Sequence, residues 1–390
     1  MEHFKQRRIK MIEEKIIDEV LQSNKHSFSE GKFSQLQVEL RPLKRPDGSE
    51  VGDIFDAWIW LDNPSQYNSY TTETLRQLCL ALDWASCRAD INCIILTAVG
   101  EKAFCTGGNT VEYENEYSWK PQEYRTYMGV FNRMVSLILE NEKPVINRVN
   151  GMRIAGGQEM GLACDFTISS DLARYGQAGP KHGSAPDGGS TDFLDLYVGF
   201  ARSIESCVLC EQWSAHKAMH LGLVNEIVPV LQDGSGNWVA NPMVTFDWVN
   251  SSTGQIVFGD FLVGEEAKVA KELKDKCTID FSRLDAAVAG LSWKLANTFP
   301  GCTRKTLSSV RKKKLHWWDS NRESNREWLA LNMAVEAAAG FRAFNVGGGK
   351  REDGSRIPRQ VDFIEVRQAI ARGEAWTPEL VESFMPHQKE

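Results

Sequence analysis

The sequence predicts an α/β fold in which helices cover a largely parallel sheet. Between Asp56 and Pro229, short apolar runs alternate with longer amphipathic ones, a pattern typical of repeated β-α-β units. Two glycine-rich segments each follow an apolar run, as expected where a buried strand turns into a helix. The chain has 390 residues, of which 42% are hydrophobic and 25% charged. This length and composition allow a large core and exclude wholesale disorder.

The first repeat begins with a predicted strand at residues 56–61, DAWIWL. A helix is predicted at 71–88, because its apolar residues recur at helical spacing. The apolar run INCIILTAV at 91–99 predicts a buried strand, and it leads into the glycine-rich loop AFCTGGN at 103–109. A second helical stretch precedes Lys143 and completes the repeat.

The second repeat has the same order of elements. Residues 144–150, PVINRVN, predict a buried strand, and the glycine-led segment 155–165, AGGQEMGLACD, predicts a helix. The run FTISS at 166–170 is the next predicted strand. Because each helix connects two strands of one sheet, the strands are expected to be mostly parallel.

Changes in composition divide the chain into four regions. Residues 1–50 are polar and end in RPLKRPDGSE, whose prolines and Asp-Gly pair predict turns, so we expect a peripheral extension. Residues 51–230 carry the α/β repeats. Residues 231–300 are rich in turn-forming residues before helical segments resume, which predicts an insertion with turns and helices. Residues 301–390 are expected to be a C-terminal helical region.

Charge and cysteine usage limit the classes of partner. The chain has 45 Lys and Arg against 52 Asp and Glu, a net charge of -7, so no global positive field would attract a nucleic acid. No run has the length and apolar character of a signal peptide or a membrane span, so we expect no membrane partner. Nine cysteines, several of them inside apolar runs, predict reduced thiols and a cytoplasmic location.

Three short motifs have residue types that can form metal or phosphate sites. Cys207 and Cys210 form a CxxC without the second pair that structural zinc needs, so helix packing is expected instead. His216 and His220 are four residues apart but lack the glutamate of HExxH, and a solvated helix face is expected. The run RKKK at 311–314 is expected to face solvent, with contact to coenzyme A phosphates as the alternative. No metal site is predicted.

The two glycine loops, 103–109 and 150–161, carry the chemical prediction. Glycine lets a backbone approach a ligand closely, and a helix that starts at the loop adds free N–H groups and its positive end. Paired amides from two such loops can form an oxyanion hole. The alternative is that each loop is only a tight turn between strand and helix. Neither loop matches a nucleotide-binding fingerprint.

Together these motifs resemble the crotonase (enoyl-CoA hydratase/isomerase) superfamily. AFCTGGN is similar to its first oxyanion loop, NGMRIAGGQEMGLACDFTISS to its second, and LCEQWSAHKAMHLGLVNEIVP to its late signature. The resemblance implies a spiral of ββα turns and a C-terminal helical region that packs in a trimer or a dimer of trimers. It also implies an acyl-coenzyme A thioester as ligand, held by the amides of Gly108 and Gly156, and no separate cofactor.

The same resemblance suggests catalytic residues. Glu159 matches the first of two glutamates that hydratases use, although a glutamate in a first helical turn also simply complements the helix dipole. The position of the second glutamate is occupied by Gly179, which argues against a plain hydratase. Asp187, in a P-D-x-G sequence, and His182 are candidates for activating water, and their alternatives are a turn-forming Asp and a structural His. Ser184 is a candidate for hydrogen bonding to substrate.

Further substrate and coenzyme A contacts are implied by resemblance only. They comprise Gln66, Tyr67 and Asn68 in NPSQYNSY, which departs from the usual wording of the family there, and Ala103, Phe104, Thr106, Gly107 and Asn109 in the first loop. The segment MAVEAAAGFRAFN near the C terminus is similar to the naphthoyl-CoA synthases, whose last helices reach a neighbouring subunit. Alternatively, this segment is an amphipathic helix that completes the core.

The long extension and insertion, together with these motifs, are most similar to the ring-opening crotonases of anaerobic benzoyl-CoA degradation. That resemblance implies water addition to a cyclic oxo-enoyl-CoA, followed by retro-Claisen cleavage of the ring. Both stages would pass through a thioester enolate between Gly108 and Gly156. The alternatives are a ring-forming naphthoyl-CoA synthase, an enoyl-CoA hydratase, and a non-catalytic scaffold that binds RNA.

Overall fold

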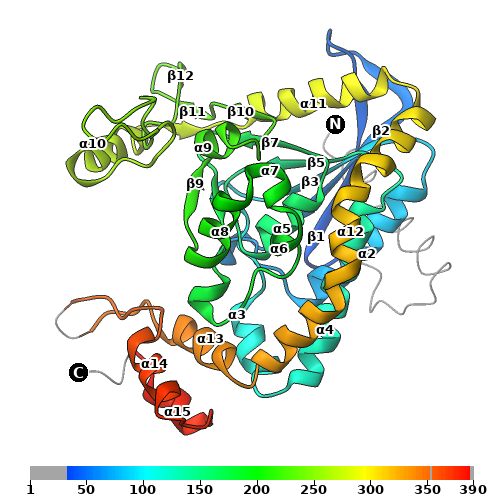
Figure 1. The fold of residues 1–390 in the computed structure, drawn as a ribbon. Helices are drawn as coiled ribbons and strands as arrows, with labels where there is room; N and C mark the ends of the chain where they lie inside the picture. The colour runs from blue at the N-terminus through cyan, green and yellow to red at the C-terminus, as the bar shows by residue number, and fades with distance from the viewer. Residues whose placement is uncertain (1–32, 352–353, 387–390) are drawn as a thin grey trace.

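The computed structural model describes residues 33–351 and 354–386, and its centre is a six-stranded sheet (Figure 1). The strands in spatial order are β1 (Leu36–Lys44), β2 (Glu50–Leu61), β3 (Ile91–Ala98), β5 (Val145–Val149), β7 (Phe166–Ser170) and β10 (Glu226–Val228). Only the β1–β2 pair is antiparallel, and all other neighbours in this sheet are parallel. The predicted α/β class with a largely parallel sheet is therefore confirmed.

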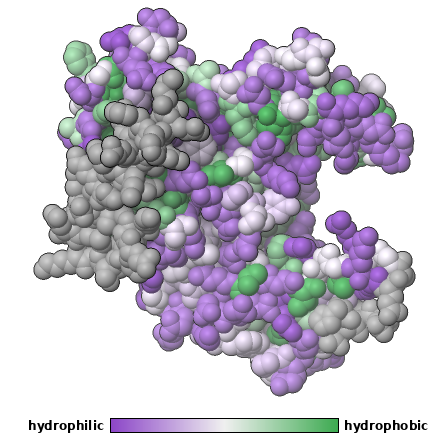
Figure 2. Space-filling model, turned by 180° about the vertical axis from the view of Figure 1, so that it is seen from behind, coloured by the Kyte–Doolittle hydropathy of each residue, from purple (hydrophilic) through white to green (hydrophobic). Residues whose placement is uncertain are grey.

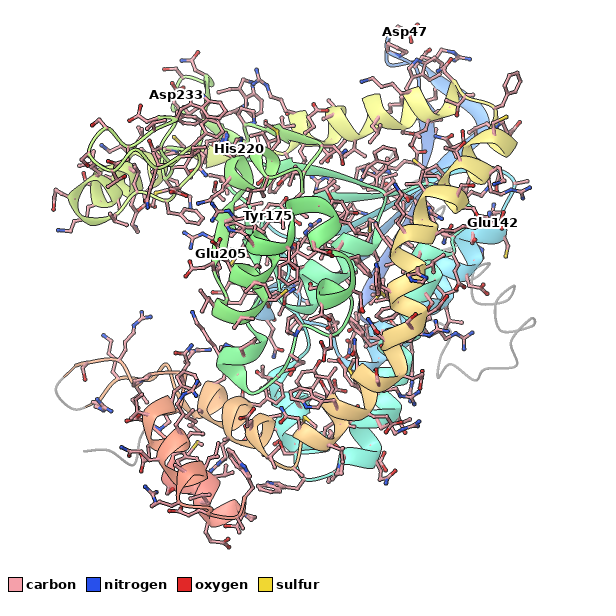
Figure 3. The ribbon with its side chains drawn as sticks, viewed as in Figure 1. Asp47, Glu142, Tyr175, Glu205, His220 and Asp233 are labelled. Atoms are coloured by element: carbon pink, nitrogen blue, oxygen red, sulfur yellow. The ribbon has the colours of Figure 1, made fainter. Side chains whose placement is uncertain are left out.

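A second, four-stranded sheet lies beside the first. Its strands, in spatial order, are β4 (Ala103–Cys105), β6 (Met152–Ile154), β8 (Arg174–Gly176) and β9 (Gln212–Ser214). The first three strands of this sheet each follow a strand of the main sheet in the chain, so the repeating unit contains two strands. The ββα spiral implied by the family resemblance is confirmed. Tyr175 of β8 is wholly buried and donates a 2.6 Å hydrogen bond to Ser169 of β7 (Figure 3).

Helices cover both faces of the main sheet. One face carries α2 (Thr72–Cys87), α4 (Pro121–Leu139), α5 (Gly156–Ala163) and the long α12 (Pro300–Asn332). α11 (Ser282–Ala296) packs on the other face through Leu284 and Val288. α2 begins where Thr71 accepts a hydrogen bond from the amide of Thr74, which satisfies a donor that a helix start otherwise leaves free. Each buried leucine of such a face contributes roughly 1.5–3 kcal/mol.

The N-terminal part of the main sheet differs from the prediction. Residues 36–44 fall within the predicted peripheral extension 1–50, but they form β1, whose Leu36 and Val38 belong to the core. The predicted Asp-Gly turn is present: Gly48 has φ +83° and donates to the carbonyl of Arg45, which links β1 to β2. Residues 1–32 of the predicted extension lie outside the described residues.

The predicted insertion, 231–300, consists of two structurally different parts. Its first part is a lobe with three short strands, β11 (Leu231–Gln232), β12 (Trp238–Val239) and β13 (Thr278–Ile279), and helix α10 (Gly264–Lys274). This lobe projects from the body of the molecule (Figure 1). Its second part is α11, which covers the main sheet and so belongs to the core. The turn-rich sequence predicted the lobe, whereas the packing of α11 depends on contacts distant in sequence.

The lobe docks on α9 (Ala215–His220) through aromatic contacts. His216 is buried with its ring edge-on to Phe246, and His220 lies edge-on to Trp248 of the lobe (Figure 3). The expectation of a solvated helix face was wrong for His216, which the lobe buries, whereas His220 keeps an exposed side chain. No cluster of His, Cys, Asp or Glu suited to a metal ion was found among the described residues.

The basic run 311–314 on α12 has a structural role that neither interpretation anticipated. Arg311 and Asp165 form a buried, two-pronged ion pair with N–O distances of 2.7 and 2.5 Å. Lys314 donates to the carbonyls of Leu162 and Cys164 at the C-terminal end of α5. Two of the four cations therefore fasten α12 to α5 and to the start of β7, instead of facing solvent or phosphate.

Shorter helices and the C-terminal region complete the structure. They are α3 (Thr110–Glu112), α6 (Ser190–Phe193), α7 (Asp195–Val198), α8 (Phe200–Leu209), α13 (Glu336–Val346), α14 (Phe363–Ala371) and α15 (Pro378–Ser383). α13 to α15 share a small apolar core and form a second projection. Seen from behind, this projection and the lobe stand apart on one side of the molecule (Figure 2).

Cys207 on α8 and Cys210 at its end are buried, and all nine cysteines are free thiols. In the described part of the chain, no helix is both long and apolar enough to cross a bilayer.

Candidate active site

A cavity of about 650 Å³ contains parts of both glycine loops in its wall. Its wall also includes residues from the starts of α3 and α5, from α4, and from the C-terminal helix α13. A larger cavity, of about 890 Å³, lies between the β1–β2 hairpin and the start of α12. None of the predicted site residues lines that larger cavity, so the chemistry belongs to the smaller one.

The two glycine loops meet at this cavity. A β-carbon on Gly107, which has φ +96°, would lie 3.0 Å from the β-carbon of Ala155 and 3.2 Å from the amide nitrogen of Gly156. Gly156 is the first residue of α5, so no earlier turn accepts its N–H. Within the described residues, neither the amide of Gly108 nor that of Gly156 donates a hydrogen bond to another protein group. Two unpaired donors therefore lie on one cavity, as an oxyanion hole requires.

Tyrosine side chains lie against both of these glycines. A β-carbon on Gly156 would overlap the hydroxyl of Tyr70, and one on Gly108 would overlap the hydroxyl of Tyr113. Both tyrosines line the cavity. Glycine is thus required at the two positions by the close approach of a phenol as well as by the exposure of the amide.

Glu159, on the first turn of α5, also lines the cavity and is 6% exposed. One of its carboxylate oxygens accepts a 2.8 Å hydrogen bond from the backbone N–H of Gly188. Burial and, to a smaller extent, the nearby Asp187 raise the pKa of Glu159 to about 8, against the lowering effect of the Gly188 hydrogen bond. A carboxyl that titrates near neutral pH can both take up and return a proton during a reaction.

His182 and Asp187 have different relations to the cavity. His182 lines it, edge-on to Phe344 with ring centroids 4.9 Å apart, and its Nδ1 is buried without a partner in the described part of the chain. Burial lowers the pKa of His182 to about 4, so the imidazole is uncharged at neutral pH. Asp187 accepts a 2.9 Å hydrogen bond from Thr191 and is not part of the wall. Burial also raises the pKa of Asp187.

Comparison with known proteins connects this geometry to a family. Residues 57–240 match the family model for enoyl-CoA hydratase/isomerase. A 6-oxocyclohex-1-ene-1-carbonyl-CoA hydrolase from Thauera aromatica is 52% identical over 90% of this chain and 91% of its own. The chain belongs to the enoyl-CoA hydratase/isomerase family. A hydrolase of the same name from Syntrophus aciditrophicus is 48% identical over 86% of this chain and 87% of its own.

Solved structures of the family have the same fold. An enoyl-CoA hydratase/isomerase from Xanthobacter autotrophicus Py2 superimposes with a TM-score of 0.57 at 20% identity, covering 88% of this chain and 99% of its own. An enoyl-CoA hydratase from Mycobacterium avium subsp. paratuberculosis also gives 0.57, at 18% identity, over 79% of this chain and 98% of its own. Members of the enoyl-CoA hydratase/isomerase family act on acyl-CoA substrates.

The structure separates the contacts that family resemblance suggested into two groups. Those on the cavity wall are Gln66, Tyr67, Thr106, Asn109 and Ser184, and those away from it are Asn68, Ala103, Phe104 and Gly107. The side chain of Asn68 is used internally, because its amide donates to the carbonyls of Val99 and Ala103. Phe104 is a fully buried core residue.

Gly179 is the residue that the family resemblance placed at the position of a second hydratase glutamate. A β-carbon at this position would lie 2.8 Å from the carbonyl oxygen of Ser184, whose own amide donates to the Gly179 carbonyl. Any side chain at residue 179 therefore requires this loop to move. The loop is built for glycine, and the cavity lacks a second glutamate at that point.

Sequence reasoning missed several residues of the wall. They are Tyr70, Tyr113, Tyr124, Phe131, Phe341, Phe344, Asn345 and Arg359. The tyrosines and phenylalanines are typical of buried helix faces, so their types alone did not distinguish a cavity wall from a core. α13 contributes Phe341 and Phe344 to the cavity of its own chain, and this helix completes the core as well. The segment MAVEAAAGFRAFN therefore lines the cavity and completes the core of its own chain.

Proposed function

We propose that this protein opens the ring of 6-oxocyclohex-1-ene-1-carbonyl-CoA with two waters to give 3-hydroxypimeloyl-CoA. The observation that carries the proposal is that two unpaired backbone amides and a carboxyl of pKa about 8 converge on one cavity. The curated hydrolases that are 52% and 48% identical to this chain support the choice of substrate. No cofactor is needed beyond the coenzyme A of the substrate.

In the first stage, water adds to the double bond conjugated with the thioester. The electron pair of the double bond moves toward the thioester oxygen, which the amides of Gly108 and Gly156 stabilise as an enolate. Each such donor contributes roughly 3–4 kcal/mol in other oxyanion holes. The Glu159 carboxylate accepts the proton of the attacking water and returns it to the α-carbon.

In the second stage, another water attacks the ring ketone. The bond between the ketone carbon and the α-carbon breaks, and its electron pair forms the same thioester enolate, so one oxyanion hole serves both stages. One proton of this water ends on the α-carbon, and its oxygen becomes part of the new carboxylate. His182, which lines the cavity and is uncharged at neutral pH, is the better candidate to accept the proton, and Asp187 is the alternative.

The test is mass spectrometry of the products formed from 6-oxocyclohex-1-ene-1-carbonyl-CoA in heavy-oxygen water. A linear 3-hydroxydicarboxyl-CoA with label in both the hydroxyl and the new carboxylate is expected. A hydrated product that is still cyclic would instead indicate a hydratase. If no product forms, ring-forming activity or a non-catalytic role becomes the better explanation.

We also propose that the chain acts in the cytoplasm as a homo-oligomer, a trimer or a dimer of trimers. Phe200, Ile204 and Val208 recur every four residues on α8, and each is 45% exposed or more. An exposed apolar stripe of this kind is typical of protein–protein contacts. The nine free thiols are consistent with a reducing compartment. Light scattering of the purified protein measures the mass, and a monomer at micromolar concentration would contradict this assembly.

A further inference from the structure

Tyr70 has a hydroxyl group that the protein itself leaves unused. The residue is 3% exposed and lines the cavity, yet its hydroxyl has no hydrogen-bond partner in the described part of the chain. Nearby tyrosines differ: the hydroxyls of Tyr113 and Tyr127 bond to each other, and that of Tyr117 bonds to Thr72. A phenol on a cavity wall whose hydroxyl bonds to no protein group is free to donate to a ligand bound there.

The backbone holds this phenol rigidly beside the oxyanion hole. The amide of Tyr70 donates to the carbonyl of Gly107 at 3.0 Å, and its carbonyl accepts from Asn109 at 2.9 Å. The ring packs against Phe131 with centroids 5.7 Å apart. The hydroxyl reaches the space that a β-carbon of Gly156 would occupy. Tyr70 therefore joins the first glycine loop through its backbone and the second through its side chain.

The phenol keeps its proton and can therefore donate a hydrogen bond. Burial raises the pKa of Tyr70 well above its usual value, and the charge of Glu159 raises it further. The hydroxyl therefore stays protonated, and it is preorganised to stabilise negative charge that forms next to it.

The ring-opening stage creates a second oxyanion besides the thioester enolate. When water adds to the ring ketone, the ketone oxygen becomes an alkoxide. Only one carbon separates the ketone carbon from the thioester carbon, so this oxygen lies within a few ångströms of the thioester oxygen. The amides of Gly108 and Gly156 are occupied by the thioester, and the alkoxide needs another donor.

We propose that the hydroxyl of Tyr70 donates a hydrogen bond to the ring ketone oxygen and stabilises the alkoxide formed during ring opening. This inference rests on the proposed function. As the water oxygen bonds to the ketone carbon, the C=O electron pair moves onto the oxygen beside Tyr70, and His182 or Asp187 accepts a proton from the water. When the C–C bond breaks, that pair reforms C=O in the new carboxylic acid. The bonding pair passes to the thioester enolate, whose α-carbon is then protonated.

The test compares Tyr70→Phe with Tyr117→Phe and the wild type. Both variants remove one phenol hydroxyl from the same hydrophobic core, but Tyr117 is not part of the cavity wall. Mass spectrometry over time measures hydration and ring opening separately. Tyr70→Phe is expected to slow ring opening by about 10²–10³-fold, as for loss of one oxyanion donor. The hydrated, still cyclic intermediate then accumulates, whereas Tyr117→Phe behaves like the wild type.

A substrate without the ring ketone, cyclohex-1-ene-1-carbonyl-CoA, separates a chemical role from a folding defect. Tyr70→Phe should hydrate it at the wild-type rate. Unchanged ring opening by Tyr70→Phe would overturn the assignment of Tyr70, and so would an equal loss of hydration of both substrates. If the wild type forms no ring-opened product at all, the proposed function itself fails. This last result is distinct, because it does not depend on any variant.

Discussion

The amide of Gly188 donates a 2.8 Å hydrogen bond to Oε1 of Glu159 at the start of α5. The backbone amides of Gly188 and Ser190 both lower the pKa of Glu159, but they do not compensate for burial, so the pKa remains raised, at about 8. In the free enzyme at neutral pH, most molecules therefore carry a protonated Glu159.

The first prediction concerns the pH dependence of turnover. The base form of Glu159 increases as the pH rises, so kcat/KM should rise about tenfold per pH unit below 8 and level off above it. Glu159→Gln should lower kcat/KM by about 10²–10⁴-fold. It should also abolish the rising limb of the pH profile, that is, the increase of kcat/KM below pH 8. Equal ring-opening turnover in Glu159→Gln and the wild type would contradict the role given to Glu159.

A second prediction uses Asp192, whose charge also raises the pKa of Glu159. Asp192 accepts a 2.7 Å hydrogen bond from Asn321 and does not line the cavity. Asp192→Asn keeps an acceptor oxygen but removes the charge, so the pH limb of kcat/KM should move to lower pH by less than about one unit. An unmoved limb would mean that the two carboxyls are not electrostatically coupled.

A third prediction concerns stability against pH. The folded-state pKa of Glu159, about 8, lies above the ordinary glutamate pKa of 4.5, so the folded state binds this proton more tightly than the unfolded chain. The resulting destabilisation is absent below pH 4.5, grows as the pH rises, and is complete above about 8. Glu159→Gln removes this cost, so its unfolding free energy should exceed that of wild type by about 2–5 kcal/mol at pH 9 and be similar at pH 4.5. Denaturant titrations at the two pH values measure both differences.

A fourth prediction compares two ion pairs of α12. Arg311 and Asp165 are 3% and 6% exposed, so Arg311→Met leaves a buried carboxylate unpaired and should cost about 3–5 kcal/mol of unfolding free energy. The pair between Arg304 and Glu142, at 2.9 Å, is well exposed. Arg304→Met should therefore change stability by less than about 1 kcal/mol. If a denaturant titration shows similar losses of unfolding free energy for both substitutions, burial does not decide how much each ion pair contributes.

A fifth prediction tests the glycines of the oxyanion hole. A methyl group on Gly108 or Gly156 overlaps a tyrosine hydroxyl, so alanine at either residue should displace a loop and lower kcat by at least about 10²-fold. Gly290, on α11, has open space at its β-carbon, and alanine there should leave kcat unchanged. It should also stabilise the protein by about 0.5–1 kcal/mol. Normal turnover in Gly156→Ala would rule out this glycine as an oxyanion donor.

The sequence was most informative where local pattern and structure coincide. Apolar runs such as residues 91–99 are buried strands, and glycine-led segments such as 155–165 begin helices at the cavity. β1 was missed although Leu36, Val38 and Leu40 alternate with polar residues as in a strand, because the prolines and Asp-Gly pair that follow indicate turns. The periodicity of apolar residues indicates which face of a helix or strand is buried. It does not show which distant segment of the chain covers that face.

The misread positions have partners far away in the chain. Arg311 looked like part of a solvated charge run, because its partner Asp165 lies almost 150 residues earlier. His216 looked exposed, because the lobe that covers it follows it in sequence. The sequence around Tyr70 indicates neither a core residue nor a ligand-binding residue. In the structure, its place on the cavity wall and its hydroxyl without a protein partner indicate a binding role. Such long-range pairings require the folded structure.

The cavity wall is assembled from residues that range from Ser65 to Arg359. On the ribosome, the main sheet and both glycine loops are complete once β10 has been made, whereas the last wall residues emerge roughly ten seconds later at about 5–20 residues per second. A nascent chain therefore carries its oxyanion loops before it has a closed pocket. The binding of acyl-CoA becomes possible only near the end of synthesis, so the ligand can stabilise only nearly complete chains.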